Sequence, residues 1–342
     1  MKKILSIDGG GIRGIVPGQV LAALESKIQQ RTQNPQARLA DYFDFFAGTS
    51  TGGILACIYL CPAAGDPTKA RFSAEEAVAL YLEYGDDIFD VSFWHRIRTQ
   101  DGISDEKYDA AELEKRLKQY LGDIKLSQLL KPCLITAYDI EKRVEFFFTQ
   151  HDAILRGKGY DFLVRDVARA TSAAPTYFEA ARVKALDGKS YPLIDGGLFM
   201  NNPALGAYSE VRNGQENPTT EDMFIVSLGT GSSNRSYKYD KAKNWGAIGW
   251  VKPIISIMMS GASATTDYHL DKIFSAAGRR NQYIRIQTDN MGNASSDIDD
   301  ASDENLRALS ELGVATAQRH DADLERIADI LLDADPDPVR FA

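Results

Sequence analysis

The stretch "ILSIDGGGIRGIVPG", residues Ile4–Gly18, places a glycine-rich turn between an apolar segment and a helical pattern. The run Lys3–Ile7 predicts a short buried strand, and the apolar spacing within Val20–Ile28 predicts a helix that starts after Pro17. A glycine turn between a strand and a helix presents backbone N–H groups to an anion. The stretch therefore predicts an α/β fold with an anion site at the end of its first strand.

The nature of that anion is left open by the turn alone. Gly9, Gly11 and Gly14 have the G-x-G-x-x-G spacing of a dinucleotide-binding turn. A dinucleotide site also needs a second strand that ends in an acidic residue about 20 positions further on, but the polar stretch Gln29–Phe43 occupies this position. The carboxylate of Asp8 would also repel a pyrophosphate. The spacing by itself is weak evidence for a nucleotide.

Strand and helix patterns alternate along most of the chain. Further strands are predicted at Asp44–Ala47, Cys133–Tyr138, Val144–Thr149, Phe224–Leu228 and Tyr283–Gln287. Helices are predicted at Ser73–Tyr84, Ala110–Tyr120, Asp161–Ala170, Pro203–Arg212 and Leu306–Leu332. This alternation predicts a mainly parallel sheet flanked by helices in three layers, with its chemistry at the carboxyl ends of the strands.

A second motif lies in "FFAGTSTGGILACIYL", residues Phe45–Leu60. Gly48 to Gly52 form a G-x-S-x-G sequence between an apolar strand and an apolar helix, which is the context of a nucleophile elbow. The glycines let the strand and helix approach closely, while Ser50 occupies the sharp turn. The helix N-terminus favours negative charge beside this serine. Ser50 is therefore the candidate nucleophile.

A serine nucleophile gives the glycine turn a function. Attack on a carbonyl creates an oxyanion, which needs N–H donors fixed in advance. We expect Gly9, Gly10 and Gly11 to supply them, with the N–H of Thr51, the residue after the nucleophile, as another donor. Arg13 adds a positive field. The predicted anion is thus a reaction intermediate.

The serine also needs a base, and Asp195 is the candidate. It ends a short apolar segment in "YPLIDGGLFMNNP", residues Tyr191–Pro203, and two glycines follow it. A buried carboxylate that touches a serine hydroxyl can accept its proton. None of the four histidines, His95, His151, His269 and His320, lies in a context that suggests a base. A triad in the order Ser50, Asp195, His269 stays open as the alternative.

The motifs "DGGGIRG", "GTSTGG" and "DGG", in this order, resemble those of the patatin-like phospholipases. The similarity extends to "EKYDAAELEKRL", "TSAAPTYF" and "LIDGGLFMNNP" and covers Met1–Gln287. It implies a patatin-like α/β domain at residues 1–288, with residues 289–342 as a helical C-terminal extension packed on the same domain.

The resemblance also implies a chemistry. It implies a Ser-Asp dyad, carried here by Ser50 and Asp195, and an oxyanion hole formed by Gly9–Gly11 with Arg13. The implied reaction is calcium-independent hydrolysis of acyl esters in phospholipids, lysophospholipids or galactolipids, with no cofactor. Three alternatives remain. The chain could be a phospholipase effector activated by a nucleotide messenger, a storage or interaction protein, or an actin-like kinase, although a kinase leaves Ser50 and Asp195 unexplained.

Composition limits the partners. The 342 residues carry 39 lysines and arginines against 48 acidic residues, a net charge of −9 with histidine neutral. This charge argues against nucleic acid and against strong attraction to anionic lipid, so transient membrane or micelle contact must use apolar surface. Three cysteines, Cys57, Cys61 and Cys133, are too few for a disulfide framework and are expected as small buried hydrophobic residues. No signal peptide or membrane-spanning run is apparent, which predicts a cytoplasmic location.

Two further segments invite a functional interpretation. The acidic stretch "SSDIDDASDE", Ser295–Glu304, fails the EF-hand pattern, and we expect a solvated acidic helix start there instead of a metal site. The apolar stretch "WVKPIISIMMSGASATTDYHL", Trp250–Leu270, could form an acyl-chain wall or interfacial face, but a buried helix is the expectation.

Overall fold

A mostly parallel sheet forms the centre of the molecule. The computed structural model describes residues 1–88, 110–214, 216–232 and 236–333. The sheet strands in these ranges are β1 (Lys2–Ile7), β2 (Phe45–Gly48), β5 (Cys133–Asp139), β6 (Val144–Thr149), β7 (Ala181–Lys184), β8 (Ser190–Asp195), β9 (Met223–Leu228) and β10 (Tyr283–Ile286). Their order is β10-β9-β1-β2-β5-β8-β7, with β6 paired to β5. A separate hairpin contains β3 (Pro62–Ala63) and β4 (Asp66–Ala70).

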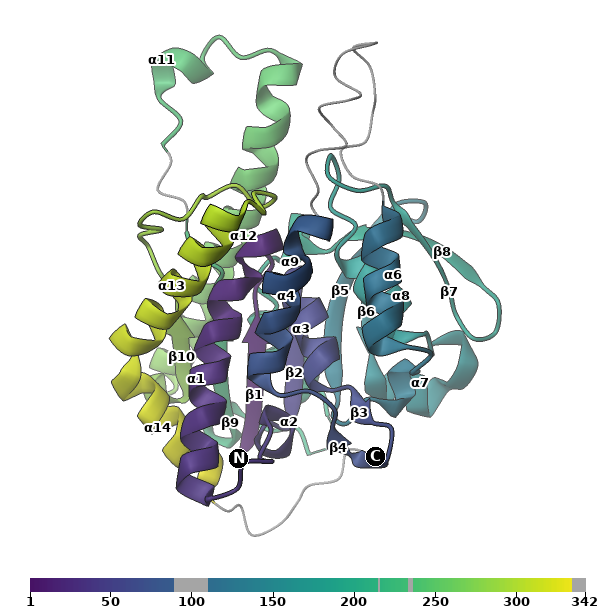
Figure 1. Cartoon of the computed structure of the whole chain (residues 1–342), viewed down its shortest axis with the longest axis vertical. Coiled ribbons are helices and arrows are strands. Elements are labelled where there is room, and N and C mark those ends of the chain that lie inside the picture. Colours follow the sequence, from purple (N-terminus) through teal and green to yellow (C-terminus); the bar gives the residue numbers. More distant parts are fainter. Residues whose placement is uncertain (89–109, 215, 233–235, 334–342) are drawn as a thin grey trace.

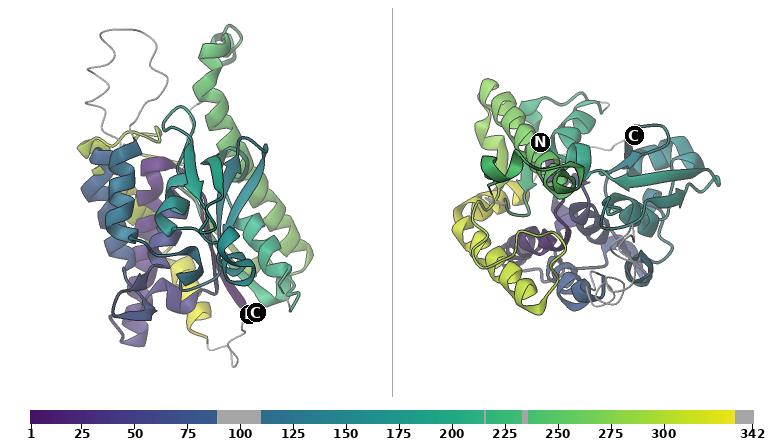
Figure 2. Two further views of the ribbon diagram at one scale, coloured as in Figure 1. Left: turned by 90° about the vertical axis from the view of Figure 1, so that its right-hand side faces the viewer. Right: turned by 90° about the horizontal axis from the view of Figure 1, so that it is seen from above.

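Helices cover both faces of the sheet, as Figure 2 shows. On one face lie α1 (Ile15–Thr32), α3 (Thr51–Tyr59), α4 (Ala74–Ile88), α6 (Ala110–Leu121) and α8 (Val164–Thr171). On the other lie α9 (Gly197–Met200), α10 (Ala204–Arg212) and α12 (Ala247–Ala276). The shorter helices α2, α7 and α11 span Leu39–Tyr42, Gln150–Arg156 and Tyr239–Ala242. The predicted three-layer α/β architecture is confirmed.

The central strands are apolar on both sides because both sides are buried. In β1, Leu5 and Ile7 belong to the core under α1 and α3, whereas Ile4 belongs to the core under α10 and α12. This explains why the strand has no polar alternation. The three cysteines are free and buried, as expected.

The C-terminal helices α13 (Asp303–Arg319) and α14 (Asp321–Leu332) pack on α1. Helical periodicity predicts one segment over Leu306–Leu332, but the structure breaks it at His320. The Lys3 ammonium donates to the carbonyl of Leu331 at 3.1 Å, which ties the end of α14 to the start of β1. The expected domain boundary at residues 288/289 remains a prediction.

The apolar stretch Trp250–Leu270 corrects the sequence-based expectation. It lies in α12, and only the second half of this helix packs on the sheet, through Leu270 and Phe274. A helix of 30 residues is about 45 Å long, whereas a six-residue strand spans about 20 Å. The first half of α12 therefore extends past the sheet and is not buried (Figure 1). None of the helices in the described ranges combines the length and apolar character needed to cross a bilayer.

Candidate active site

Ser50 occupies a sharp turn between β2 and α3. Its backbone has φ 54° and ψ −125°, a left-handed conformation that is uncommon outside glycine. The two positions that flank the turn have no room for a side chain. A Cβ on Gly48 would lie 2.4 Å from the carbonyl oxygen of Gly52, and a Cβ on Gly52 would lie 2.2 Å from that of Ile7. The geometry is that of the predicted nucleophile elbow.

Hydrogen bonds from neighbouring helices hold the turn. The amide of Ser50 donates to the Thr171 hydroxyl at the end of α8, at 2.9 Å. The Thr51 hydroxyl donates to the phenol oxygen of Tyr81 in α4, at 2.8 Å. Because Thr51 is the first residue of α3, its own amide has no acceptor within the helix. The turn is therefore fixed, and one N–H group beside Ser50 is available to an anion.

The branching of the sheet at β5 brings Asp195 to Ser50. The parallel strand β2 pairs with the first half of β5, with Gly48 opposite Ile135. The antiparallel strand β8 pairs with the second half, with Asp195 opposite Ala137. The last residues of β2 and β8 thus meet only two positions apart along β5, about 7 Å. The ends of β2 and β8, almost 150 residues apart in the sequence, therefore converge at this point.

Asp195 is buried and lies against the Ser50 hydroxyl. Only 3% of its surface is exposed, and burial raises its pKa from 3.8 to about 7. Hydrogen bonds from the Ser50 hydroxyl and from the Gly197 amide, the latter at 2.7 Å, limit this rise. A carboxyl group with a pKa near neutrality can take up and return a proton at physiological pH.

The glycine turn lies beside Ser50 with its carbonyl groups held on one side. The carbonyl of Gly9 accepts hydrogen bonds from the Thr230 hydroxyl at 2.9 Å and the Asn201 amide group at 3.3 Å. The carbonyl of Gly10 accepts from the backbone and the Nε of Arg13, both at 3.3 Å. All of these peptides are trans, so their N–H groups point the opposite way. The amides of Gly10 and Gly11 are thereby directed away from the anchoring side chains.

The three glycines have different roles. The amide of Gly9 donates to the Asn201 carbonyl at 3.0 Å and is engaged there, although the sequence suggested it as an oxyanion donor. A Cβ on Gly9 would lie 3.2 Å from the Ser50 Cβ, which places the turn against the serine. Gly11 has φ +59°, lines the same cavity as Ser50, and would place a Cβ 2.1 Å from the Ile298 carbonyl oxygen. The amides of Gly10 and Gly11, in contrast, point away from the side chains that hold the Gly9 and Gly10 carbonyls.

Arg13 anchors the turn from its C-terminal side. In addition to the Gly10 carbonyl, its guanidinium donates to the Gly231 carbonyl at 3.3 Å. Burial lowers its pKa to about 10, while Tyr177 and Asp297 act in the opposite direction. Arg13 is therefore charged at neutral pH and adds a positive field beside Gly10.

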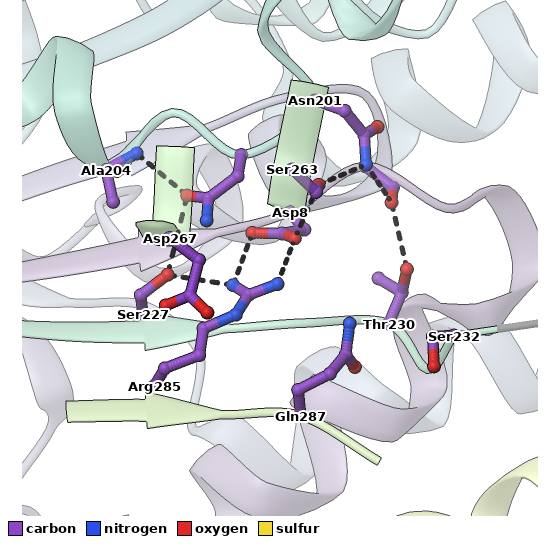
Figure 3. Close-up of polar contacts among 12 residues, drawn as sticks. Asp8, Asn201, Ala204, Ser227, Thr230, Ser232, Ser263, Asp267, Arg285 and Gln287 are labelled. Carbon is purple, nitrogen blue, oxygen red and sulfur yellow. Dashed lines mark hydrogen bonds and ion pairs between the residues drawn. The ribbon is translucent and has the colours of Figure 1, made fainter. Parts of the chain in front are cut away.

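The side chain of Asp8 points toward Arg285 and Ser263 (Figure 3). Its two carboxylate oxygens accept from both terminal nitrogens of Arg285, at 2.8 and 2.6 Å, and one of them also accepts from the Ser263 hydroxyl at 3.1 Å. Arg285 also donates to Ser227, at the carboxyl end of β9, at 2.8 Å. A bidentate pair of this kind is strongly oriented. The pairing of Asp8 with Arg285 therefore fixes the start of the glycine turn.

An apolar cavity begins at Ser50 and Asp195. Three helices, α3, α4 and α6, supply half of the residues that line it, and Tyr177 and Met259 also line it. The apolar side chains from these helices are Ile54, Ile58, Leu80, Leu113, Leu117 and Leu121. The apolar lining suits an acyl chain, and Ser50 lies where the cavity begins.

The histidines lie elsewhere. His269 is exposed on α12, and its ring packs edge-on against Tyr268. His151 pairs with Glu210 at 2.9 Å, and His320 with Asp323. None of these three lines the cavity that holds Ser50, and His95 lies outside the described residues.

The acidic segment Ser295–Glu304 has two parts. Ser302 caps α13 by accepting from the Asn305 amide, and Glu304 is exposed in the first turn, as expected. Its first part is only partly solvated: Asp297 is exposed, but the Ile298 carbonyl accepts from the Ile12 amide at 2.9 Å and Ile298 lines the cavity. In the described ranges, no cluster of three or more metal-binding side chains occurs.

Several residues that hold the site were not predicted individually. Asn201 lies within the quoted "LIDGGLFMNNP" motif, and Thr171 opens the "TSAAPTYF" motif, yet neither received a role. Thr230 follows β9 in "SLGTG", and a small polar residue after a buried strand is the signal that could have indicated it. The pairing of Arg285 with Asp8 joins residues 277 positions apart, and no sequence pattern predicts it.

Comparison with known proteins identifies the family of the chain. Residues 5–208 match the family model described as patatin-like phospholipase. The chain is 35% identical over 340 residues to patatin-like protein 2 of Oryza sativa subsp. japonica, covering 92% of this chain and 83% of the relative. It is 31% identical over 329 residues to probable inactive patatin-3-Kuras 1 of Solanum tuberosum, covering 92% and 85%. Human GIVD cytosolic phospholipase A2 aligns in structure with a TM-score of 0.47 and 12% identity, over 97% of this chain and 60% of that one. The chain belongs to the patatin-like phospholipase family.

Proposed function

We propose that this protein is a lipid acyl hydrolase in which Ser50 is the nucleophile and Asp195 is the base. One observation carries the proposal: a serine in a strained elbow touches a buried carboxyl group with a pKa near 7, at the start of an apolar cavity. Family membership supports action on lipid esters. The proposed substrates are phospholipids, lysophospholipids or galactolipids.

The first half of the reaction forms an acyl-enzyme. Asp195 accepts the Ser50 proton as Oγ attacks the ester carbonyl, and the carbonyl oxygen becomes an oxyanion. Collapse of this intermediate breaks the bond to the alcohol, which leaves with the proton that Asp195 returns. In the second half, Asp195 takes a proton from water, and the resulting hydroxide attacks the acyl group. Collapse then releases the fatty acid and restores the Ser50 hydroxyl with that proton.

The oxyanion is assigned to the amides of Gly10, Gly11 and Thr51. The anchored carbonyls of the glycine turn support this assignment, because they direct the first two amides away from Arg13 and Thr230. The charge of Arg13 favours the intermediate from behind the turn. Donors that are fixed before the reaction require no reorganisation when the charge appears.

A dyad explains the site better than a triad with histidine. Asp195 contacts Ser50 directly, whereas in a triad the carboxylate would contact the histidine. His269 is exposed and does not line the cavity. The proposed reaction is also calcium-independent, since it needs only the residues named here.

Product analysis tests this function. The test matters because one similar protein in the family is named as probably inactive. The protein is incubated with phosphatidylcholine, lysophosphatidylcholine and monogalactosyldiacylglycerol, with and without a chelator, and products are identified by mass spectrometry. We expect free fatty acid in both conditions and none from Ser50→Ala. A fluorophosphonate probe should label Ser50 alone. Equal hydrolysis by Ser50→Ala, or hydrolysis that requires calcium, would contradict the proposal.

A further inference from the structure

The first half of α12 carries an apolar stripe that no part of the described chain covers. Trp250, Val251, Ile254, Ile257 and Met258 are each 38–48% exposed. At about 100° per residue, these positions fall within a sector of roughly 120° on one side of the helix. Core-facing helices bury such a stripe, and this one faces outward.

Aromatic side chains join this stripe to the segment before it. The Trp245 ring makes edge contacts with Tyr237 and Trp250, with ring centres 5.5 and 5.1 Å apart. Tyr239 in α11 is 77% exposed. Tryptophan and tyrosine combine an apolar body with a polar tip, and for this reason they concentrate where lipid meets water. We call residues 236–260 the α11–α12 projection; Figure 1 shows it extending past the body of the molecule.

The charge of the projection is opposite to that of the whole chain. Residues 236–260 contain four lysines and one aspartate, while the protein has a net charge of −9. Lys238, Lys241 and Lys243 are exposed, and Asp240 is paired with Lys243 at 2.9 Å. The overall charge, which argued against attraction to anionic lipid, therefore does not describe this surface.

The projection is continuous with the catalytic cavity. Met259, next to the stripe residue Met258, lines the cavity that holds Ser50 and Asp195. In Figure 1 the projection extends from the end of the sheet at which the parallel strands finish, and Ser50 follows the end of β2. A bilayer held by the stripe would therefore lie at the same end of the molecule as the cavity, which Met259 reaches from another side of α12.

We propose that the α11–α12 projection docks the protein on bilayers that contain anionic lipid. The apolar stripe would enter the boundary between headgroups and acyl chains, and the exposed lysines would face the anionic headgroups. This inference rests on the proposed function and names the surface through which the enzyme meets its substrate. A second copy of the chain is a poorer occupant, because a symmetric contact through the stripe would bring the lysines of both copies together.

Vesicle binding tests the inference without catalysis. Ser50→Ala protein is sedimented with vesicles of phosphatidylcholine alone or with about one fifth phosphatidylglycerol. We expect binding mainly to the anionic vesicles, with weaker binding at high salt. Adding Trp250→Ser, Ile254→Ser and Met258→Ser should reduce the bound fraction at least tenfold by this mechanism. The control is Ile154→Ser with Leu155→Ser on α7, whose apolar side chains are more exposed than those of the stripe, at 56% and 64%; its binding should not change.

Activity measurements separate this inference from the proposed function. In the protein that retains Ser50, the triple variant should hydrolyse vesicle phospholipid at least tenfold more slowly but a water-soluble short-chain ester at the normal rate. Unchanged vesicle binding by the triple variant would overturn the docking surface. A stable dimer that the triple variant converts to monomer would also overturn it. Absence of ester hydrolysis, with vesicle binding intact, would contradict only the proposed function.

Discussion

The catalytic centre and the α11–α12 projection differ in how the chain holds them. Around Ser50 and the glycine turn, α4, α8 and the segments after β8 and β9 contribute hydrogen bonds, and both Ser50 and Asp195 are almost fully buried. The projection is held by edge contacts between aromatic rings, and its apolar side chains face outward. The first region is held by hydrogen bonds from several elements of the chain. The second has apolar surface that needs a partner outside it.

This difference fits two separate functions, catalysis in the first region and lipid binding in the second. Chemistry needs donors and a base that are fixed before the substrate arrives. Binding to a lipid surface needs exposed apolar side chains, whose transfer out of water lowers the free energy. The predictions that follow ask whether the catalytic centre acts as one fixed unit, and how sensitive each of its parts is.

The largest effect should come from the dyad. We expect Ser50→Ala and Asp195→Asn each to lower kcat on the order of 10⁴-fold, and the double variant to be scarcely worse, because the two residues act as one unit. The measurement is steady-state hydrolysis of a short-chain ester by folded proteins. His269→Ala is the contrasting variant and should keep most of its activity. Severe loss in His269→Ala with modest loss in Asp195→Asn would replace the dyad with a triad.

The next effect should come from the glycine turn. Gly11→Ala would place a Cβ 2.1 Å from the Ile298 carbonyl oxygen at a backbone φ of +59°. The displaced amide should reduce kcat by about 10²–10³-fold. Gly278→Ala is the matched control, because Gly278 follows α12 with φ +69° and open space around it, so it carries a similar backbone strain away from the cavity. Equal kcat in the two variants would mean that the Gly11 amide is not a donor to the oxyanion.

A smaller effect should come from an anchor of the turn. Thr230→Val removes the hydroxyl that holds the Gly9 carbonyl and should lower kcat about tenfold, with little change in KM, because the Gly10 amide loses its fixed direction. Thr316→Val is the control. Its hydroxyl is also buried and donates to a carbonyl, that of Leu312 within α13. If both variants keep the wild-type kcat, the anchors do not set the direction of the amides.

The sequence predicted some strands of the sheet and missed others. The buried parallel strands β1, β2, β5, β9 and β10 have local apolar patterns, and so does the antiparallel strand β6, so all six were predicted within one or two residues. The antiparallel strands β7 and β8 were not. The first has only four residues, and Pro192 interrupts the apolar pattern of the second, which pairs on both sides.

Site residues followed a similar rule. Ser50, the glycine turn and Asp195 carry their own sequence signals, because a tight turn needs glycine. Thr171, Thr230 and Arg285 act through contacts that only the folded chain creates. The exposure of the α12 stripe was mispredicted for the same reason: an apolar helical pattern says which side chains share a face but not whether the sheet is long enough to cover it.

A separate prediction concerns pH, and it tests the burial of Asp195. Its pKa is raised from 3.8 to about 7 in the folded protein, so between these values the folded state holds a proton that the unfolded state has lost. Stability from this group is therefore fully present below pH 4, falls as the pH rises, and is lost above pH 7. Asp195→Asn removes the free-energy cost of ionising this buried carboxyl group and should therefore raise Tm. The difference in Tm from wild type should be near zero at pH 4 and greatest at pH 8, where it corresponds to at most about 4 kcal/mol of unfolding free energy. Calorimetry of both proteins across this range measures it, and the pH dependence of kcat/KM in wild type should show the matching loss of activity below pH 7. A Tm difference that does not change with pH would mean that Asp195 is ionised throughout, and that the hydrogen bonds from Ser50 and Gly197 offset its burial.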